Sequence, residues 1–238
     1  MRPVSGLSVK IFADGADLSS MQELYRRPYV KGFTTNPTLM RKAGVGDYRE
    51  FARQVLQAIP DRPISFEVFS DEFEDMARQA REIASWGEHV YVKIPVTNTR
   101  SESACELVRS LTKSGVKVNV TAIFSLAQVR DVVGALDGGA PACVSVFAGR
   151  VADTGYDPVP LMSAAVEMLR VAPNTELIWA SPRELLNVFQ ADEIGCHIIT
   201  VTSDILEKLS LVGKDLEDYS LDTVKMFYND ARQAGFAI

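Results

Sequence analysis

The sequence lacks the features that mark membrane and secreted proteins. No apolar run among its 238 residues approaches the length needed to span a bilayer, and the segment from Met1 to Asp17 has no apolar core of the signal-peptide type. Only three cysteines occur, Cys105, Cys143 and Cys196, and their spacing forms no pairs. A disulfide framework is therefore not expected, and a reducing compartment is favoured. These absences predict a cytoplasmic protein that has no membrane partner.

Positive charge is also scarce. Lys and Arg total 25 against 31 for Asp and Glu, which gives a formal net charge of −6, and no Lys/Arg cluster offsets it locally. Such a surface repels nucleic acid. The two histidines, His89 and His197, fit no metal-ligand spacing, and no glycine-rich dinucleotide fingerprint is present. We therefore expect no nucleic-acid partner, no metal and no cofactor.

What the sequence does contain is a regular alternation of short β-rich runs with longer amphipathic stretches. Its composition, 47% hydrophobic and 24% charged, suits a globular protein with a large core. Eight β-rich runs lie at about 9–14, 32–36, 64–69, 90–95, 116–121, 143–148, 176–181 and 196–201. The clearest helical stretches lie at 72–86, 102–114, 125–136, 160–171, 183–192, 204–212 and 222–234.

This alternation predicts the fold class. Strands separated by helices run parallel, because parallel neighbours need crossover connections. A count of eight favours a closed barrel over an open doubly wound sheet, although a flavodoxin-like sheet remains an alternative. We therefore predict an α/β protein, a single (β/α)8 TIM-barrel domain over 1–238 with an additional C-terminal helix.

Three capping-box patterns predict where helices begin. They are Ser20 with Glu23, Thr99 with Glu102, and Ser181 with Glu184, the last with Pro182 at the first helical position.

Polar side chains interrupt the expected strands at a spacing of two residues. Strands of a parallel barrel are covered on both faces and should be almost continuously apolar, and a spacing of two places residues on one face. Most of these residues fall near the C-terminal ends of the strands, where barrel enzymes place their active sites. The interrupting residues are Asp14, Thr35, Asn36, Ser65, Glu67, Lys93, Asn119, Thr121 and Ser145.

Lys93 is the most informative of these residues. Val92 and Ile94 alternate with it, so its ammonium should point into the barrel. The structural alternative is a lysine that is buried only because it pairs with Glu67 or Asp14. The functional interpretation is a nucleophile, because desolvation favours the neutral amine that attacks a carbonyl. Asp14 and Glu67 would then supply the acid and base groups.

A second group of candidates follows the sixth and seventh strands. Ser181 and Arg183 lie just after the seventh, and the loops after the last strands of barrels often bind phosphate. Arg150, just past the sixth strand, is a further candidate, since the guanidinium fork matches phosphate geometry. For Ser181 the alternative is a role as helix cap, and for Arg150 it is an ordinary surface arginine.

Together these residues resemble the transaldolase family, and the similarity runs through nearly the whole chain. Any one of the seven matching segments is weak, but seven in the correct order on successive strands are specific. The segments are F-A-D at 12–14, T-T-N-P-T at 34–38, F-E-V at 66–68, V-K-I-P at 92–95, N-V-T at 119–121, S-V-F-A-G-R at 145–150 and A-S-P-R at 180–183.

The resemblance implies a role for each matching residue. Lys93 matches the lysine that forms a Schiff base, and Asp14 matches the aspartate that removes the proton of the substrate hydroxyl. Glu67 and Thr121 match the pair that positions a catalytic water. The groups that hold the lysine region and the dihydroxyacetone hydroxyls are Thr35, Asn36, Asn119 and Ser145. The phosphate-binding set is Arg150, Ser181 and Arg183.

The family has two branches, and two residues favour one of them. Fructose-6-phosphate aldolases carry Gln where Glu67 stands and Tyr where Phe147 stands. Glu67 and Phe147 therefore indicate a transaldolase, which moves a dihydroxyacetone unit from a ketose phosphate to an aldose, as in pentose phosphate metabolism. Resemblance to the short members also implies a ring-like homo-oligomer, a pentamer or decamer, in which the C-terminal helix packs against neighbouring subunits.

Some positions depart from the family pattern. Gly15, Val146, Ala148, Thr202 and Ser203 replace residues that are common there, which suggests an unusual sugar substrate in a biosynthetic or sulfosugar pathway. Two alternatives to the transaldolase hypothesis remain. One is an aldolase that releases free dihydroxyacetone, and the other is a sugar-phosphate-binding barrel without catalytic activity.

Overall fold

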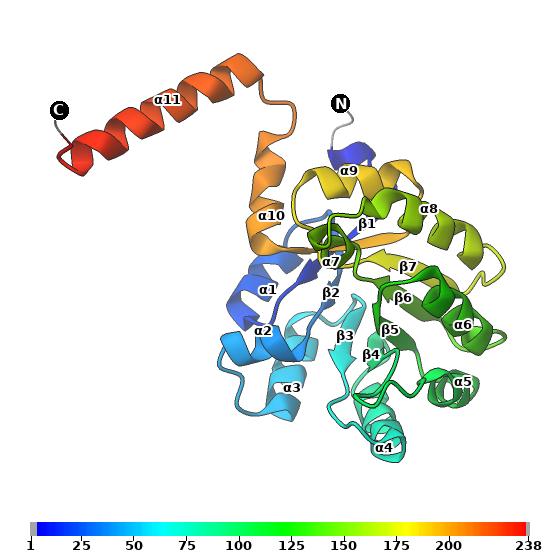
Figure 1. Ribbon diagram of the computed structural model, residues 1–238. Helices are drawn as coiled ribbons and strands as arrows, with labels where there is room; N and C mark the ends of the chain where they lie inside the picture. Colours follow the sequence, from blue (N-terminus) through cyan, green and yellow to red (C-terminus); the bar gives the residue numbers. More distant parts are fainter. Residues whose placement is uncertain (1–3, 237–238) are drawn as a thin grey trace.

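Eight short strands pair in chain order and close a barrel (Figure 1). In the computed structural model, which describes residues 4–236, every neighbouring pair is parallel, and β1 pairs with both β2 and β8. The strands are β1 (Lys10–Asp14), β2 (Val30–Thr34), β3 (Ile64–Glu67), β4 (Val90–Pro95), β5 (Val118–Ile123), β6 (Ala142–Val146), β7 (Thr175–Trp179) and β8 (Ile198–Thr202). The predicted (β/α)8 barrel is confirmed.

Helices follow the strands and form an outer layer around the barrel (Figure 1). They are α1 (Leu18–Tyr25), α2 (Pro37–Lys42), α3 (Tyr48–Ala58), α4 (Phe73–Ala84), α5 (Cys105–Lys113), α6 (Leu126–Leu136), α7 (Ala148–Asp153), α8 (Pro158–Leu169), α9 (Leu186–Glu193), α10 (Ser203–Glu207) and α11 (Leu216–Gln233). Short 3-10 helices lie at Val4–Gly6 and Lys208–Leu211. The sequence patterns predicted every strand to within a few residues but missed α2, α3 and α7.

The apolar core is divided by the barrel wall. A large cluster fills the space between the strands and the helices, and a smaller one inside the barrel contains Phe12, Cys143 and Ile178. Gly32 on β2 makes room for Phe12, since a Cβ at this glycine would overlap the phenyl ring. Where these side chains meet, the interior of the barrel is therefore a packed core and not a pore.

The three predicted capping boxes are wrong. Ser20 lies within α1, whose cap is Asp17. Thr99 binds Asp71, and α5 begins only after Ala104. Ser181 has a backbone φ of 60°, and α9 begins after Leu185. Each of these residues had the right pattern, but tertiary contacts or backbone geometry determine where the helix starts.

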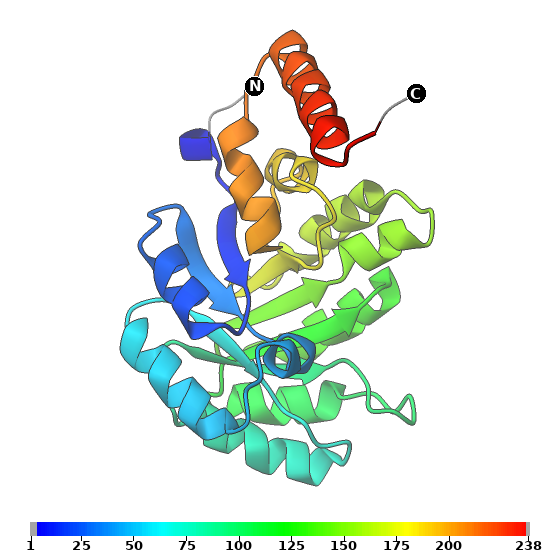
Figure 2. The ribbon, with the colours of Figure 1, turned by 90° about the vertical axis from the view of Figure 1, so that its left-hand side faces the viewer.

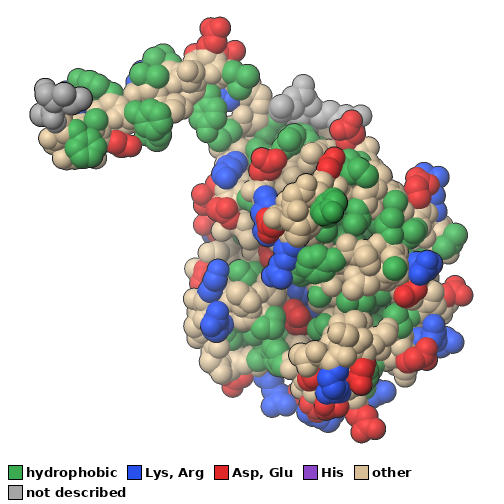
Figure 3. Space-filling model, viewed as in Figure 1, with side chains coloured by type: hydrophobic (Ala, Val, Ile, Leu, Met, Phe, Trp, Pro, Cys, Tyr) green, Lys and Arg blue, Asp and Glu red, His purple; other side chains and the backbone are tan. Residues whose placement is uncertain are grey.

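The last helix projects away from the barrel (Figures 1 and 2). No residue of α11 is buried, although it carries Leu216, Val224, Phe227 and Tyr228, all largely exposed. Figure 3 shows hydrophobic side chains along this projecting arm. The additional C-terminal helix is thus confirmed, and within residues 4–236 no helix is both long and apolar enough to cross a membrane.

Candidate active site

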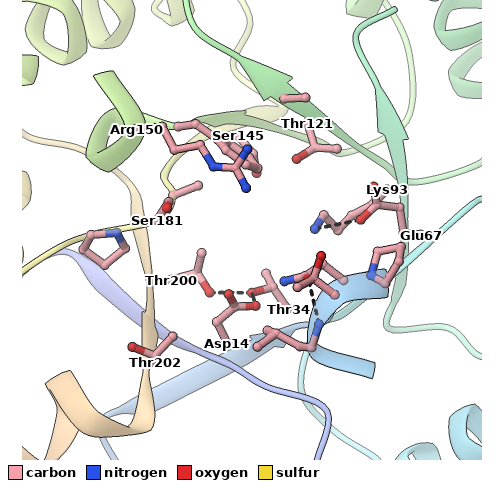
Figure 4. A pocket seen from close by; sticks show the side chains of 18 of the residues that line it. Asp14, Thr34, Glu67, Lys93, Thr121, Ser145, Arg150, Ser181, Thr200 and Thr202 are labelled. Atoms are coloured by element: carbon pink, nitrogen blue, oxygen red, sulfur yellow. Dashed lines mark hydrogen bonds and ion pairs between the residues drawn. The ribbon is translucent and has the colours of Figure 1, made fainter. Parts of the chain in front are cut away.

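A cavity of about 690 Å³ opens at the C-terminal ends of the strands (Figure 4). Barrel enzymes place their active sites at this end. Nearly every strand and several of the following loops contribute to its wall. Among the lining residues are Asp14, Thr34, Asn36, Lys42, Glu67, Lys93, Thr121, Ser145, Phe147, Arg150, Ser181, Arg183, Thr200, Thr202 and Asp204.

Lys93 lies at the inner wall of this cavity. Its side chain is 8% exposed, and its Nζ lies 3.2 Å from Oε2 of Glu67, which is 14% exposed. The same nitrogen donates a hydrogen bond of 2.9 Å to the carbonyl oxygen of Thr35. Glu67 and Lys93 are direct partners in the β3–β4 ladder, so the strand register brings these two side chains together. The amine is thereby fixed by two acceptors while still bordering the cavity.

Asp14 lies across the cavity at the end of β1 (Figure 4). Thr34 donates to its Oδ1 at 2.8 Å, and the Thr34 hydroxyl also lies within hydrogen-bonding distance of the Thr200 hydroxyl. Because Thr34 has only one hydroxyl proton, Thr200 must donate in that second bond. Burial raises the pKa of Asp14 above its usual value, against the opposing effects of the Lys93 charge and the Thr34 hydrogen bond. A raised pKa makes this carboxylate a stronger base.

A buried polar chain crosses the barrel next to Lys93. Ser145 donates to Asn119 at 2.7 Å, and Asn119 donates to Ser65 at 3.1 Å. These bonds satisfy side chains that would otherwise be costly to bury. By contrast, the Thr121 hydroxyl is buried and makes no hydrogen bond within residues 4–236. It faces the cavity and can bond to a ligand there.

Two arginines at the rim of the cavity, Arg150 and Arg183, differ in their contacts. Arg183 donates through Nε to Asp153 at 2.8 Å, forms a second bond to the same carboxylate, and donates to Ser181 at 3.0 Å. Arg150 instead lies over the ring of Phe147, with 5.1 Å from guanidinium carbon to ring centroid. No ion pair of Arg150 is found in the described part of the chain. Arg150 is therefore the less neutralised cation at this rim.

Two of the three non-glycine residues with positive φ among the described residues line the cavity, the third being Ser101. Ala122 and Ser181 both line it, and both have positive φ, 61° and 60°, a region that non-glycine residues rarely adopt. The Ser181 carbonyl packs against Gly149 so closely that a Cβ there would overlap the carbonyl oxygen. Gly149 directly precedes Arg150, so this close approach fixes the two candidate phosphate-binding segments against each other.

The cavity brings together ten of the thirteen side chains singled out from the sequence. The exceptions are Thr35, whose hydroxyl donates to the Ser65 carbonyl, and Ser65 and Asn119, whose side chains are buried. Thr35 reaches Lys93 through its carbonyl oxygen instead. Asn36 lines the cavity but also caps α2 by accepting from the amide of Leu39.

Several lining residues were not singled out from the sequence. Thr34 and Thr200 are ordinary strand residues by composition, since threonine favours strands. Lys42 and Asp204 lie on helices α2 and α10, and only the fold brings them to the rim. In the described part of the chain, no three His, Cys, Asp or Glu side chains are grouped as metal ligands would be.

Comparisons with known proteins place this chain in a family. The family model for Transaldolase/Fructose-6-phosphate aldolase matches residues 11–238. A protein from Dehalococcoides mccartyi named "Probable transaldolase" is 36% identical over 202 residues, covering 84% of this chain and 90% of that one. Another of the same name from a Thermoanaerobacter species is 35% identical over 231 residues, covering 97% and 100%.

Solved structures show the same fold at much lower identity. An HpcH/Hpal aldolase/citrate lyase family protein from Burkholderia cenocepacia has a TM-score of 0.60 at 15% identity, covering 92% of this chain and 95% of that one. A 2,3-dimethylmalate lyase has a TM-score of 0.57 at 12% identity, covering 98% and 86%. At such identities only the barrel is shared.

The eight-stranded barrel, with a polar cavity at one end, belongs to the (β/α)8-barrel class of proteins. With the sequence match across almost its full length, the chain belongs to the transaldolase/fructose-6-phosphate aldolase family.

Proposed function

We propose that this protein is a transaldolase that forms a Schiff base through Lys93. The observation that carries the proposal is the enclosed Lys93 amine, held 3.2 Å from Glu67 at a cavity whose other wall carries Asp14. An amine in such a site can attack a carbonyl, and the two carboxyl groups can move the protons that the reaction requires.

The proposed reaction starts when Lys93 passes a proton to Glu67 and the neutral amine adds to the ketone carbon of a ketose phosphate. Loss of water then gives an iminium ion, with the protons passing through the water that Glu67 and the free Thr121 hydroxyl hold. Asp14 takes the proton of the substrate's C4 hydroxyl, and the C3–C4 bond breaks. The bonding electron pair moves into the iminium group to give an enamine, and an aldose phosphate leaves.

The second half reverses these steps on another aldose. The enamine carbon attacks the acceptor aldehyde, Asp14 returns its proton to the new hydroxyl, and water hydrolyses the iminium to free Lys93. The raised pKa of Asp14 suits both tasks, since the group must accept a proton and hold it until the acceptor arrives. In this scheme Ser145 and Asn36 hold the dihydroxyacetone hydroxyls from the cavity wall, and Asn119 supports Ser145 from below.

The phosphate of donor and acceptor would lie at the rim formed by Arg150, Ser181 and Arg183. Arg150 forms no ion pair within residues 4–236, and Arg183 donates a hydrogen bond to the Ser181 hydroxyl. Guanidinium groups match phosphate oxygens in geometry and charge. A phosphorylated sugar would thereby extend from this rim to Lys93.

Acceptor dependence tests the transfer reaction. With a ketose phosphate alone, we expect slow turnover, and an added aldose phosphate should accelerate consumption of the donor and incorporate its three-carbon unit into a new ketose. Equal turnover without acceptor, with free dihydroxyacetone as product, would instead favour an aldolase of the fructose-6-phosphate aldolase type. No carbon–carbon cleavage with any of a panel of ketose phosphates would favour a binding protein without catalytic activity.

We also propose that α11 packs against a second copy of this chain in a ring-like homo-oligomer. The supporting observation is an 18-residue helix with no buried residue and many large exposed apolar side chains. Exposed apolar surface of this extent is unusual on a monomer and marks an interaction site.

A further inference from the structure

The hydrogen-bond ladder between β2 and β3 stops one bond short beside the active site. The amide of Phe33 donates to the carbonyl of Pro63 at 2.8 Å, and the amide of Thr35 donates to that of Ser65 at 3.1 Å. In a regular parallel ladder the next bond would run from the Glu67 amide to the Thr35 carbonyl. Neither that bond nor any later pairing of these two strands is present among the described residues.

Tyr48 at the start of α3 takes the place of the missing strand partner. Its hydroxyl accepts a hydrogen bond of 2.8 Å from the Glu67 amide and donates one of 3.0 Å to the Glu67 carbonyl oxygen. One side chain thus satisfies both backbone groups of Glu67 on the side that faces β2. Burial raises the pKa of the Tyr48 hydroxyl, so this group keeps its proton and remains a donor.

The diversion of the Glu67 amide leaves the Thr35 carbonyl oxygen for Lys93. That oxygen accepts the 2.9 Å hydrogen bond from Lys93 Nζ and receives no ladder bond from the Glu67 amide. The same lysine contacts the Glu67 carboxylate. Tyr48 therefore affects both members of the Lys93–Glu67 pair. It binds the backbone of Glu67 directly, and it leaves the Thr35 carbonyl oxygen available to Lys93.

The ring of Tyr48 is held firmly in this position. Its centroid lies 4.5 Å from that of Phe69, 5.5 Å from that of Trp86 and 6.1 Å from that of Phe66. Packed aromatic rings have few alternative rotamers and add to the stability of the contact. The hydroxyl is therefore presented to Glu67 at a fixed place, although Tyr48 does not line the cavity.

We propose that Tyr48 is a positioning residue, which holds Glu67 and leaves the Thr35 carbonyl free to hold Lys93 in its reactive place. The proposal rests on the function proposed above. Tyr48 touches no substrate, so its loss should slow the chemical steps and leave substrate binding almost unchanged. A displacement of reacting groups by a fraction of an ångström is enough to lower a rate severalfold.

The central experiment compares Tyr48→Phe with two controls. Tyr25→Phe removes a hydroxyl that bonds to exposed Asp61 at 2.9 Å, and Val55→Ala removes buried volume from the same helix, α3, without touching Glu67. We measure the rate of borohydride-trapped adduct formation, kcat, KM and the melting temperature. Tyr48→Phe should lower the trapping rate and kcat about tenfold, with KM within about twofold of wild type.

Two kinetic results would overturn the proposal. One is an unchanged trapping rate in Tyr48→Phe, and the other is an equal loss in Val55→Ala, which would reveal a general effect of rigidity.

A crystal structure of the wild-type protein provides a second test, which depends neither on activity nor on the stability of the Tyr48→Phe variant. A crystal structure of Tyr48→Phe complements it. In wild type the Tyr48 oxygen should lie within hydrogen-bonding distance of both backbone atoms of Glu67. A wild-type structure with the Glu67 amide on the Thr35 carbonyl would contradict the proposal. Absence of adduct in all proteins, with the Tyr48 contacts present, would refute the Schiff-base function alone.

Discussion

Lys93 and Glu67 form an ion pair of 3.2 Å whose two side chains are only 8% and 14% exposed. Burying two charges costs several kcal/mol per ion, and the attraction between them often does no more than repay this cost. Such a pair is a weak device for stability, and an apolar pair would fill the same space. Its position at the wall of the cavity is better explained by chemistry that needs an amine and a carboxyl group together.

Asp14→Asn should stabilise the protein at neutral pH while abolishing activity. Burial raises the folded-state pKa of Asp14, so the folded state binds this proton more tightly than the unfolded state. The stabilising contribution of Asp14 is therefore present below its unfolded pKa and is lost as the pH rises through the folded pKa. Urea unfolding from acid to neutral pH should show Asp14→Asn gaining stability relative to wild type as the pH rises. A constant difference across that range would contradict the raised pKa.

Arg150→Ala should weaken binding of phosphorylated sugars. A charge-assisted hydrogen bond to phosphate contributes about 1.5–3 kcal/mol, so KM for a ketose phosphate should rise about tenfold or more. Turnover of a non-phosphorylated ketose should be unaffected. Arg130→Ala on α6, where Arg130 pairs with Asp131, is the matched control. An equal rise in KM for both kinds of ketose would show that Arg150 does not contact the phosphate.

Gly149→Ala should disturb the rim from the backbone. The new Cβ would overlap the Ser181 carbonyl oxygen, which is main chain and cannot rotate away. We expect a loss of about 1–3 kcal/mol in the free energy of unfolding and a raised KM for the ketose phosphate. Gly134→Ala on α6, where a Cβ would meet nothing within 4 Å, is the control. Wild-type stability in Gly149→Ala would show that α7 and the backbone at Ser181 are not packed this closely.

Removal of α11 should change the oligomeric state and not the fold. A chain that ends at Gly213 keeps all eight strands and loses the exposed apolar arm. Light scattering after gel filtration should show an oligomer for the full chain and a smaller species for the shortened one. The double variant Val224→Glu and Phe227→Glu, which charges two exposed positions of α11, should have the same effect. A full chain that is monomeric at high concentration would refute the proposed assembly.

The barrel and most of the cavity were predictable because strands impose a spacing of two. Lys93, Glu67 and Thr121 interrupt apolar strands near their C-terminal ends, and barrel enzymes place their active sites at that end, which favoured the inner face. The count of strands then favoured closure. Such patterns can be recognised within one strand. The pairing of parallel strands then places their polar side chains next to each other, as in the Glu67–Lys93 pair.

What the sequence could not show depends on contacts between distant segments. Tyr48 lies 19 residues from Glu67, and nothing in its surroundings marks it as different from a core tyrosine. Thr34 and Thr200 join Asp14 through side-chain bonds between strands at the two ends of the chain. Ser181 matched a helix cap, but its left-handed backbone places it at the cavity instead.

Covalent trapping tests the central claim most directly. The protein is incubated with a ketose phosphate, reduced with borohydride, digested and analysed by mass spectrometry, with Lys93→Met and reduction without sugar as controls. We predict loss of activity together with a three-carbon adduct on Lys93, and no adduct in Lys93→Met. An active protein that carries no adduct at Lys93, or carries it on another lysine, would contradict the account.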